Sequence, residues 1–162
     1  MKVAVIGAGG HVGFPFSCVL ANSGHKVFGI DINQSIVDKI NSGEVPYIEE
    51  GAKEILQKKL TEGNIYFTTN FDYIKDCEVI AIMIGTPVDC EGNARLDDLF
   101  DFVNNTLAPR MKKGQLIVLR STVSPGTTEI LSKHIEKKYG WIEGKDYHLV
   151  FCPERVVQGK SI

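Results

Sequence analysis

The sequence predicts an α/β protein built on a doubly wound parallel sheet. Six short apolar runs, each typical of a strand buried on both faces, alternate along the chain with segments of helical pattern. A glycine-rich turn separates the first run from the first helical segment, as in a βαβ unit. With 162 residues, 43% of them hydrophobic, the chain is long enough for one domain with a sizeable core. In the common strand order 3-2-1-4-5-6, a crevice opens between strands 1 and 4 at their carboxyl ends.

The first βαβ unit is marked by residues that start and stop its elements. Lys2–Ile6 is an apolar run that predicts the first strand, and the turn Gly7–Gly13 follows it directly. The apolar segment Val12–Asn22 predicts a helix. Lys26–Ile30 predicts the second strand, and Asp31 lies at its carboxyl end.

Caps and glycines delimit the elements that follow. Asn33 is suited to cap a helix that Gly43 ends, and Asn70 is suited to cap a short one. Further helices are expected over residues 34–42, 52–62, 70–75, 96–110 and 127–139. Further strands are expected over residues 65–68, 79–84, 116–120 and 148–152.

The glycine-rich turn predicts a binding site for a dinucleotide. Glycines let the chain turn sharply and let a pyrophosphate approach backbone N–H groups that a Cβ would shield. The helix that follows presents unpaired N–H groups and the positive end of its dipole. The spacing Gly7-x-Gly9-x-x-x-Gly13 is one residue longer than usual; alternatively, Ala8 and Gly10 take the first two glycine places. A purely structural turn is the competing interpretation.

Asp31 indicates which dinucleotide binds. It lies 18 residues beyond Gly13, at the end of the second strand, where an acid can accept hydrogen bonds from the adenosine ribose. Its charge would repel a 2′-phosphate. The sequence therefore predicts NAD rather than NADP as the cofactor.

Other polar residues follow the later strands of the predicted sheet. Thr86 and Pro87 come after the fourth strand and would form the opposite wall of the crevice; Thr122 follows the fifth strand, and Glu154 follows the sixth. Thr86 and Thr122 could instead cap loops or helices, and Glu154 could be an exposed loop acid. His11 is expected to pack over the cofactor rather than to act as a base.

Composition excludes several classes of protein. With a formal charge of −2 the chain is not basic enough to suggest a nucleic-acid partner, and neither a signal segment nor a transmembrane span is expected. The four cysteines lack CxxC spacing, so no zinc or other metal is expected, and they are interpreted as reduced thiols of a cytoplasmic protein. Cys152 is expected to be buried and unactivated, because no cation stands beside it in the sequence.

Four motifs occur together and in order, and jointly they resemble a known family. They are Gly7–Gly13, Gly85–Asp89, Ser121–Thr128 and Pro153–Arg155. The chain resembles, over nearly all of its length, the amino-terminal domain of the UDP-glucose/GDP-mannose dehydrogenase family, a Rossmann-like NAD-binding domain. The sequence Pro-Glu-Arg is similar to the N-acetylated branch, the UDP-N-acetylmannosamine and UDP-N-acetylglucosamine 6-dehydrogenases, whereas the UDP-glucose branch usually has Pro-Glu-Phe.

The resemblance implies an NAD-dependent, two-step oxidation of the C6 alcohol of a UDP-sugar to a carboxylate, through a cysteine thioester. It implies that Thr122 contacts the cofactor and helps to hold the catalytic water, and that Glu154 assists hydrolysis of the thioester as a base. The implied cofactor contacts are Gly7, Gly9, Gly10, His11, Val12, Gly13, Asp31, Thr86, Pro87 and Thr122. The implied substrate contacts are Glu154, Arg155 and Val156.

The chain departs from the family pattern in two residues and in extent. Ile36 stands where many members have an arginine near the adenosine, and Gln158 stands where the UDP-glucose branch has a second glutamate. The nucleophilic cysteine, the catalytic lysine and asparagine, the central helix and the sugar-nucleotide domain lie beyond residue 162 in full-length members. Residues 1–162 are therefore expected to be an amino-terminal NAD-binding fragment that is inactive alone, from a protein that is a homodimer or larger.

Two alternatives remain at this stage. The chain could be a stand-alone NAD-binding or redox-sensing module, or part of another Rossmann reductase of the 6-phosphogluconate or ketopantoate type. The motif that begins at Thr122, together with Glu154 and Arg155, argues against the second alternative.

Overall fold

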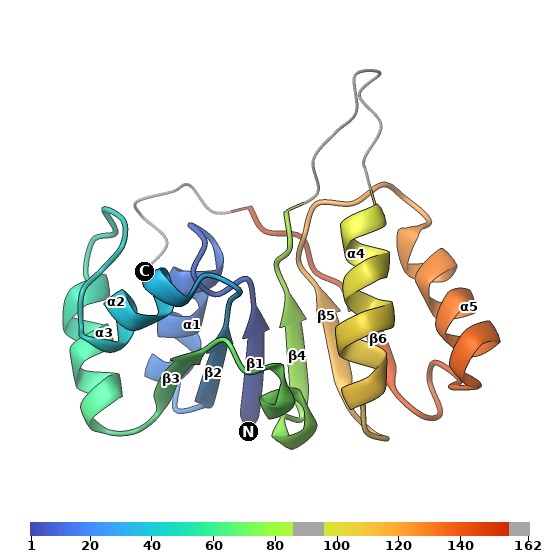
Figure 1. Ribbon diagram of the computed structural model, residues 1–162, viewed down its shortest axis with the longest axis horizontal. Helices are drawn as coiled ribbons and strands as arrows, with labels where there is room; N and C mark the ends of the chain where they lie inside the picture. Colours follow the sequence, from blue (N-terminus) through green and yellow to red (C-terminus); the bar gives the residue numbers. More distant parts are fainter. Residues whose placement is uncertain (86–95, 156–162) are drawn as a thin grey trace.

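The computed structural model describes residues 1–85 and 96–155, and its centre is one parallel sheet (Figure 1). The strands run in the order β3-β2-β1-β4-β5-β6, and every neighbouring pair is parallel. Their bounds are β1 Lys2–Ile6, β2 Lys26–Ile30, β3 Ile65–Thr68, β4 Val79–Ile82, β5 Leu116–Leu119 and β6 His148–Phe151. The predicted strand order is confirmed.

Helices cover the two halves of the sheet on opposite faces. Alternate residues of β1 enter two separate cores, since side chains of a strand point to opposite sides. Val3 and Val5 pack with α1 (Gly13–Asn22), α2 (Gln34–Asn41) and α3 (Ala52–Thr61). Ala4 and Ile6 belong to the core beneath α4 (Asp97–Phe102) and α5 (Thr127–Tyr139), as Figure 1 shows for the β4–β6 half. This is the doubly wound arrangement that the sequence predicts.

The helix predicted over residues 96–110 is less regular than expected. After α4 the chain continues as a π-helix over Val103–Leu107 and a 3₁₀ helix over Ala108–Arg110. Pro109 has no backbone N–H to donate to the carbonyl four residues earlier, so an α-helix cannot continue regularly through it. The short helix after β3, Phe71–Asp76, is also of the 3₁₀ type.

The register of the sheet brings the strand ends to one level. Ile6 of β1 pairs with both Ile30 and Ile82, Ile82 pairs with Leu119, and Leu119 pairs with Phe151. We call the segments that directly follow these five residues the strand-end rim. None of the helices in the described ranges is long and apolar enough to cross a membrane.

Candidate functional site

The strand-end rim gathers most of the predicted site residues at one edge of the sheet. The glycine turn follows β1, Asp31 follows β2, Thr122 follows β5, and Glu154 follows β6. Thr86, Pro87 and Val156 lie outside the described residues, as does Gln158. The rim is thus built from loops whose positions are fixed by the sheet beneath them.

Two glycines of the turn are needed because backbone atoms approach them closely. Gly7 has φ +80°, and a Cβ there would lie 2.5 Å from the carbonyl oxygen of Met83. A Cβ on Gly13 would lie 2.2 Å from the carbonyl oxygen of Gly7. Since neither neighbour is a side chain that could move aside, the turn and the start of α1 can pack together only with glycine at both positions.

A third glycine brings Asp31 to the turn. A Cβ on Gly9 would lie 2.8 Å from Asp31 Oδ2, and the N–H of Gly9 donates to that same oxygen at 2.8 Å. Gly10 is less crowded, because its Cβ would meet only the carbonyl oxygen of Gly7, at 3.3 Å. Of the two interpretations of the glycine spacing, the structure favours the longer one, with Gly7, Gly9 and Gly13 in the three glycine roles.

The turn also leaves backbone donors without acceptors. Gly7, Ala8 and Gly10 each donate to a backbone carbonyl. Within residues 1–85 and 96–155, the amides of His11 and Val12 have no acceptor. Val12 precedes α1, and no side chain caps that helix. Free N–H groups at the positive end of a helix dipole fit the pyrophosphate of a dinucleotide.

Asp31 is held in place beside these donors. Its second oxygen, Oδ1, accepts a hydrogen bond from the backbone N–H of Asn33 at 3.0 Å. With both oxygens oriented by backbone donors, the carboxylate keeps further lone pairs for a ligand hydroxyl. The side chain is half-buried, so a ribose could reach it.

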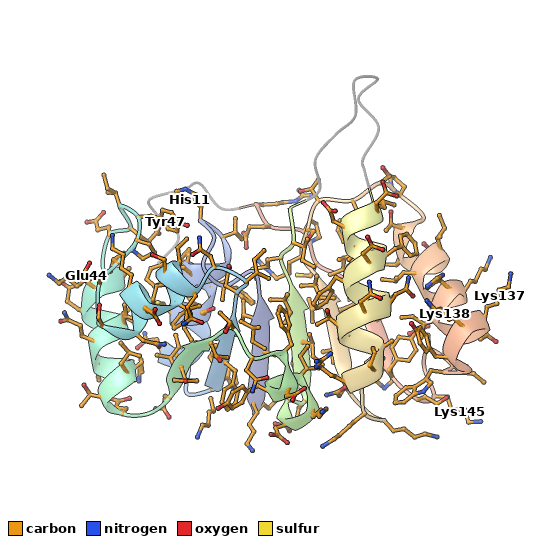
Figure 2. The ribbon with its side chains drawn as sticks, viewed as in Figure 1. His11, Glu44, Tyr47, Lys137, Lys138 and Lys145 are labelled. Carbon is orange, nitrogen blue, oxygen red and sulfur yellow. The ribbon has the colours of Figure 1, made fainter. Side chains whose placement is uncertain are left out.

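Tyr47 also belongs to the site, although no sequence motif pointed to it. Its hydroxyl donates to the carbonyl oxygen of Gly9, and its ring lies against that of His11, with centroids 3.7 Å apart. Figure 2 shows both side chains together at the same end of the molecule. Burial and the charge of Asp31 raise the pKa of Tyr47, so this phenol stays protonated and keeps its donor. His11 was predicted to pack over the cofactor; in the structure it is exposed and lies on Tyr47.

A cavity of about 450 Å³ opens next to the turn and Asp31. It lies at the carboxyl ends of β1, β2 and β4, and Phe71 and residues of α4 close its far side. Its walls are mostly apolar, and they include Gly7, Gly10 and Asp31. Its size and lining are typical of a small-molecule site, and its place is the crevice predicted between strands 1 and 4.

On the β5–β6 side of the rim, Glu154 forms an ion pair that the sequence did not predict. Its carboxylate contacts the guanidinium of Arg120, the residue that follows β5. The two side chains are only 17% and 12% exposed. The guanidinium also lies 4.2 Å from the ring centroid of Phe16, which belongs to α1. Arg120 therefore links the ends of β5 and β6 to α1, and it fixes the carboxylate at the rim.

Cys152 is a correction to the sequence prediction. The thiol is exposed rather than buried, and Arg120 Nη1 donates to its sulfur at 3.4 Å. It is exposed because β6 is an edge strand, of which Val150 and Phe151 are also exposed. The cation is distant in sequence, so no inspection of neighbouring residues could have found it.

The motif after β5 divides into structural and exposed residues. Ser121 is buried, and its hydroxyl donates to the carbonyl oxygen of Ile84 at 2.7 Å, which ties this loop to the end of β4. The hydroxyl of Thr127 donates to the carbonyl oxygen of Ser124 at 2.7 Å at the start of α5. Thr122, between them, is exposed on the rim, as is Arg155 on the neighbouring loop. Thr122 and Arg155 are thus accessible to a ligand.

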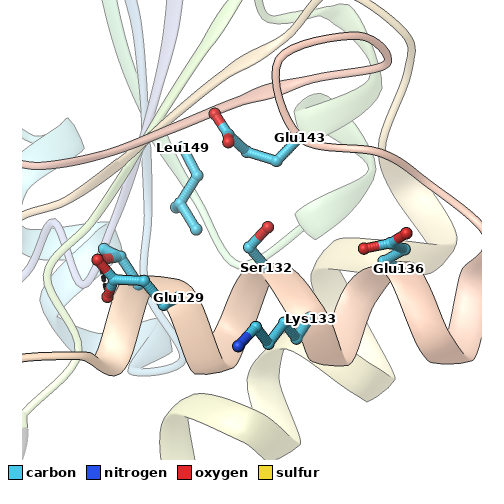
Figure 3. Close-up of a pocket in the computed structure, with 7 residues that line it drawn as sticks. Glu129, Ser132, Lys133, Glu136, Glu143 and Leu149 are labelled. Atoms are coloured by element: carbon cyan, nitrogen blue, oxygen red, sulfur yellow. Dashed lines mark hydrogen bonds between the residues drawn. The ribbon is translucent and has the colours of Figure 1, made fainter.

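A second hollow, of about 370 Å³, lies between α5 and β6 (Figure 3). Its polar lining includes Glu129, Ser132 and Glu136 from α5 and Glu143 from the turn before β6. It contains no residue of the strand-end rim, and within the described ranges no group of histidine, cysteine and acidic side chains could hold a metal ion. We assign the site to the rim.

Comparison with known proteins agrees with this site. Residues 1–162 match the family described as the UDP-glucose/GDP-mannose dehydrogenase family, NAD binding domain. The UDP-N-acetyl-D-mannosamine dehydrogenase of Pyrococcus horikoshii is 33% identical over 160 residues, which cover 99% of this chain and 38% of that protein.

Two solved structures superpose closely on the chain. That of the UDP-D-ManNAc dehydrogenase from Pyrococcus horikoshii gives a TM-score of 0.90 at 34% identity, over 98% of this chain and 37% of that one. A ternary complex of GDP-mannose dehydrogenase from Pseudomonas aeruginosa gives a TM-score of 0.89 at 29% identity, also over 98% and 37%.

In each of these comparisons the chain spans less than two fifths of the length of the relative. The match nevertheless includes the glycine turn, Asp31 and the loops after β5 and β6. The donors of the turn, the acid beside them and the parallel sheet that positions both fit NAD. The chain therefore belongs to the UDP-glucose/GDP-mannose dehydrogenase family and corresponds to its NAD-binding domain.

Proposed function

We propose that residues 1–162 form the single NAD-binding domain of a UDP-sugar 6-dehydrogenase, with UDP-N-acetylmannosamine as the favoured substrate. The observation that supports the binding mode best is the assembly of the glycine turn. The free amides of His11 and Val12 lie beside a carboxylate that the N–H of Gly9 holds at 2.8 Å. The names of the relatives and the sequence Pro-Glu-Arg support the substrate class.

In the proposed binding mode the dinucleotide crosses the rim from β2 to β5. The amides of His11 and Val12 receive the pyrophosphate, and Asp31 accepts hydrogen bonds from the adenosine ribose. Gly10 has no Cβ, and this leaves room for the phosphates beside the turn. His11, Thr86, Pro87 and Thr122 supply the remaining cofactor contacts.

The chemistry divides between the cofactor and the protein. When bound, NAD accepts hydride from the carbon that is oxidised. Thr122 positions water at the end of β5, and Glu154 accepts a proton from that water. A base must lie within hydrogen-bond reach of the proton that it takes, and the ion pair with Arg120 holds Glu154 in a fixed place at the rim. Arg155 and Val156 contact the substrate.

The remaining catalytic groups are proposed to lie outside these 162 residues. They include the nucleophilic cysteine that carries the thioester, so the isolated chain binds NAD without turning over. The whole protein is proposed to work in the cytoplasm as a homodimer or larger assembly.

A calorimetric titration of the chain with NAD and with NADP tests the binding mode. NAD is expected to bind at least about tenfold more tightly, because Asp31 would repel a 2′-phosphate. Asp31→Asn should reduce this preference, whereas Asp38→Asn, a matched change on the exposed face of α2, should not. A preference for NADP would contradict the role of Asp31. Steady NADH formation from a UDP-sugar by the chain alone would contradict the proposed division of the active site.

A further inference from the structure

The cavity beside Asp31 contains a second carboxylate that the binding mode above does not use. The cavity is lined largely by aliphatic and aromatic side chains, and Asp98 is its second acidic residue. Asp98 lies in the first turn of α4. Phe102, one turn later at position i+4, lines the same cavity, so the two share the face of α4 that is turned to it.

The carboxylate of Asp98 is available for a ligand. The side chain is exposed, and it makes no hydrogen bond or ion pair with any of residues 1–85 or 96–155. Asp97, its neighbour in the same turn of α4, does not line the cavity. An acid in the first turn stabilises a helix through the dipole, but Asp97 and Asp98 share that effect. Of these two residues of α4, only Asp98 lines the cavity, where it adds a second carboxylate to that of Asp31.

The rest of the cavity suits a flat aromatic ring. Ile32 follows Asp31 directly and is 85% exposed at this cavity, so its side chain offers a large apolar surface that a ligand could cover. Phe71 and Phe102 lie on the lining as well. Aliphatic and aromatic side chains are the usual partners of the faces of a base.

The cavity adjoins the glycine turn, and this indicates which aromatic ring of the dinucleotide would enter it. Gly10 and Asp31 line the cavity, and they flank the proposed places of the pyrophosphate and the ribose. The group attached to that ribose in NAD is adenine, whose exocyclic amine is a hydrogen-bond donor. This step rests on the proposed function.

We propose that Asp98 accepts a hydrogen bond from the exocyclic amine of adenine, and that this residue makes the site selective for adenine over hypoxanthine. Hypoxanthine carries a carbonyl oxygen in place of the amine. That oxygen would face the carboxylate with two acceptors and no donor between them, which is unfavourable. Asp98 is thus a specificity-determining residue for the base. Its role is distinct from that of Asp31, which is proposed to accept hydrogen bonds from the ribose.

The test compares NAD with nicotinamide hypoxanthine dinucleotide, in which a carbonyl replaces the amine and the adjacent ring nitrogen N1 carries a hydrogen. Calorimetric titrations of the unaltered chain should show NAD binding about tenfold more tightly, as expected for one hydrogen bond to a charged acceptor. Asp98→Asn should bring the two affinities within about threefold of each other, because its amide can donate to the carbonyl oxygen of hypoxanthine. Asp97→Asn is the matched control: it removes the same first-turn charge and should keep the tenfold preference.

Each outcome decides a different point. Equal affinity of the unaltered chain for both dinucleotides would overturn the role of Asp98 and leave the proposed function standing. So would an Asp98→Asn variant that keeps the tenfold preference while its thermal unfolding matches that of Asp97→Asn. If neither dinucleotide binds the unaltered chain, both this inference and the proposed NAD site are wrong.

Discussion

The two sides of the strand-end rim are built by different means. On the β1–β2 side, close approaches shape the site: backbone atoms crowd Gly7 and Gly13, and the side chain of Asp31 crowds Gly9. On the β5–β6 side, the site depends on an ion pair between Arg120 and Glu154, 34 residues apart. On the first side, a side chain at one of these glycines would force neighbouring atoms to move. On the second side, either charge of the ion pair can be removed by a single substitution. The comparison predicts different failures on the two sides.

The largest effect is expected from Gly13→Ala. The new methyl group would lie 2.2 Å from the carbonyl oxygen of Gly7, and only a backbone shift could relieve that contact. The free energy of unfolding should fall by about 3 kcal/mol or more, and NAD binding should be lost. Urea denaturation and calorimetry measure the two effects.

Gly10→Ala is the control for that variant. Its methyl group would meet a single backbone oxygen at 3.3 Å, so the fold should persist while the dinucleotide binds less tightly. A Gly13→Ala protein with unaltered stability would show that the close approach in the turn is not required.

The next largest effect is expected from Arg120→Met. Removing the guanidinium takes away the cation that contacts the largely buried carboxylate of Glu154 in the rim ion pair, and stability should fall by about 2 kcal/mol. In a double-mutant cycle with Glu154→Gln, the two changes should be coupled by at least about 1 kcal/mol. Lys53→Met, on the exposed surface of α3, removes one positive charge and should change stability little. Strict additivity of the two rim substitutions would count against the ion pair.

A smaller effect is expected from Tyr47→Phe, which removes one hydrogen bond to Gly9 and keeps the ring against His11. The free energy of unfolding should fall by about 1 kcal/mol, and affinity for NAD should weaken, because the turn is held less firmly. Tyr66→Phe removes a hydroxyl from an exposed ring on β3 and serves as the control. Equal behaviour of the two variants would place Tyr47 outside the site.

The smallest effect concerns pH and the amino end of β6. A hydrogen bond from the backbone N–H of Ile142 at 3.0 Å, together with Lys113 at 2.9 Å, lowers the pKa of Asp146 below its ordinary value of 3.8. Because the folded state holds this proton less tightly than the unfolded state, the stabilisation is complete above pH 3.8 and is lost as the pH falls through the folded-state pKa.

Asp146→Asn should therefore flatten the acid side of the stability profile, measured as the urea midpoint at a series of pH values. Asp101→Asn, on the exposed side of α4, should leave that profile unchanged. An unchanged acid limb in Asp146→Asn would assign the pH dependence to other carboxylates.

Much of the β1–β2 side could be predicted from the sequence. The apolar runs gave the strands, and the spacing of Gly7, Gly9 and Gly13 gave the turn, because strand alternation and glycine backbone freedom act over a few residues. Asp31 could be predicted as a candidate ribose contact because it directly follows the predicted second strand. The order of the strands could be predicted because the alternation of strands and helices is typical of a doubly wound sheet, for which 3-2-1-4-5-6 is a common order.

Tertiary structure alone decided which distant side chains meet. Tyr47 reaches Gly9 across 38 residues, and Arg120 reaches Glu154, Cys152 and the ring of Phe16 from the end of a different strand. Asp98 faces the cavity only because of the way α4 packs on the sheet. Such contacts depend on how whole elements pack, and the local sequence pattern carries no record of that. The sequence by itself therefore determined the glycine turn that is suited to NAD. The tertiary structure determined which charged and aromatic side chains lie around that turn.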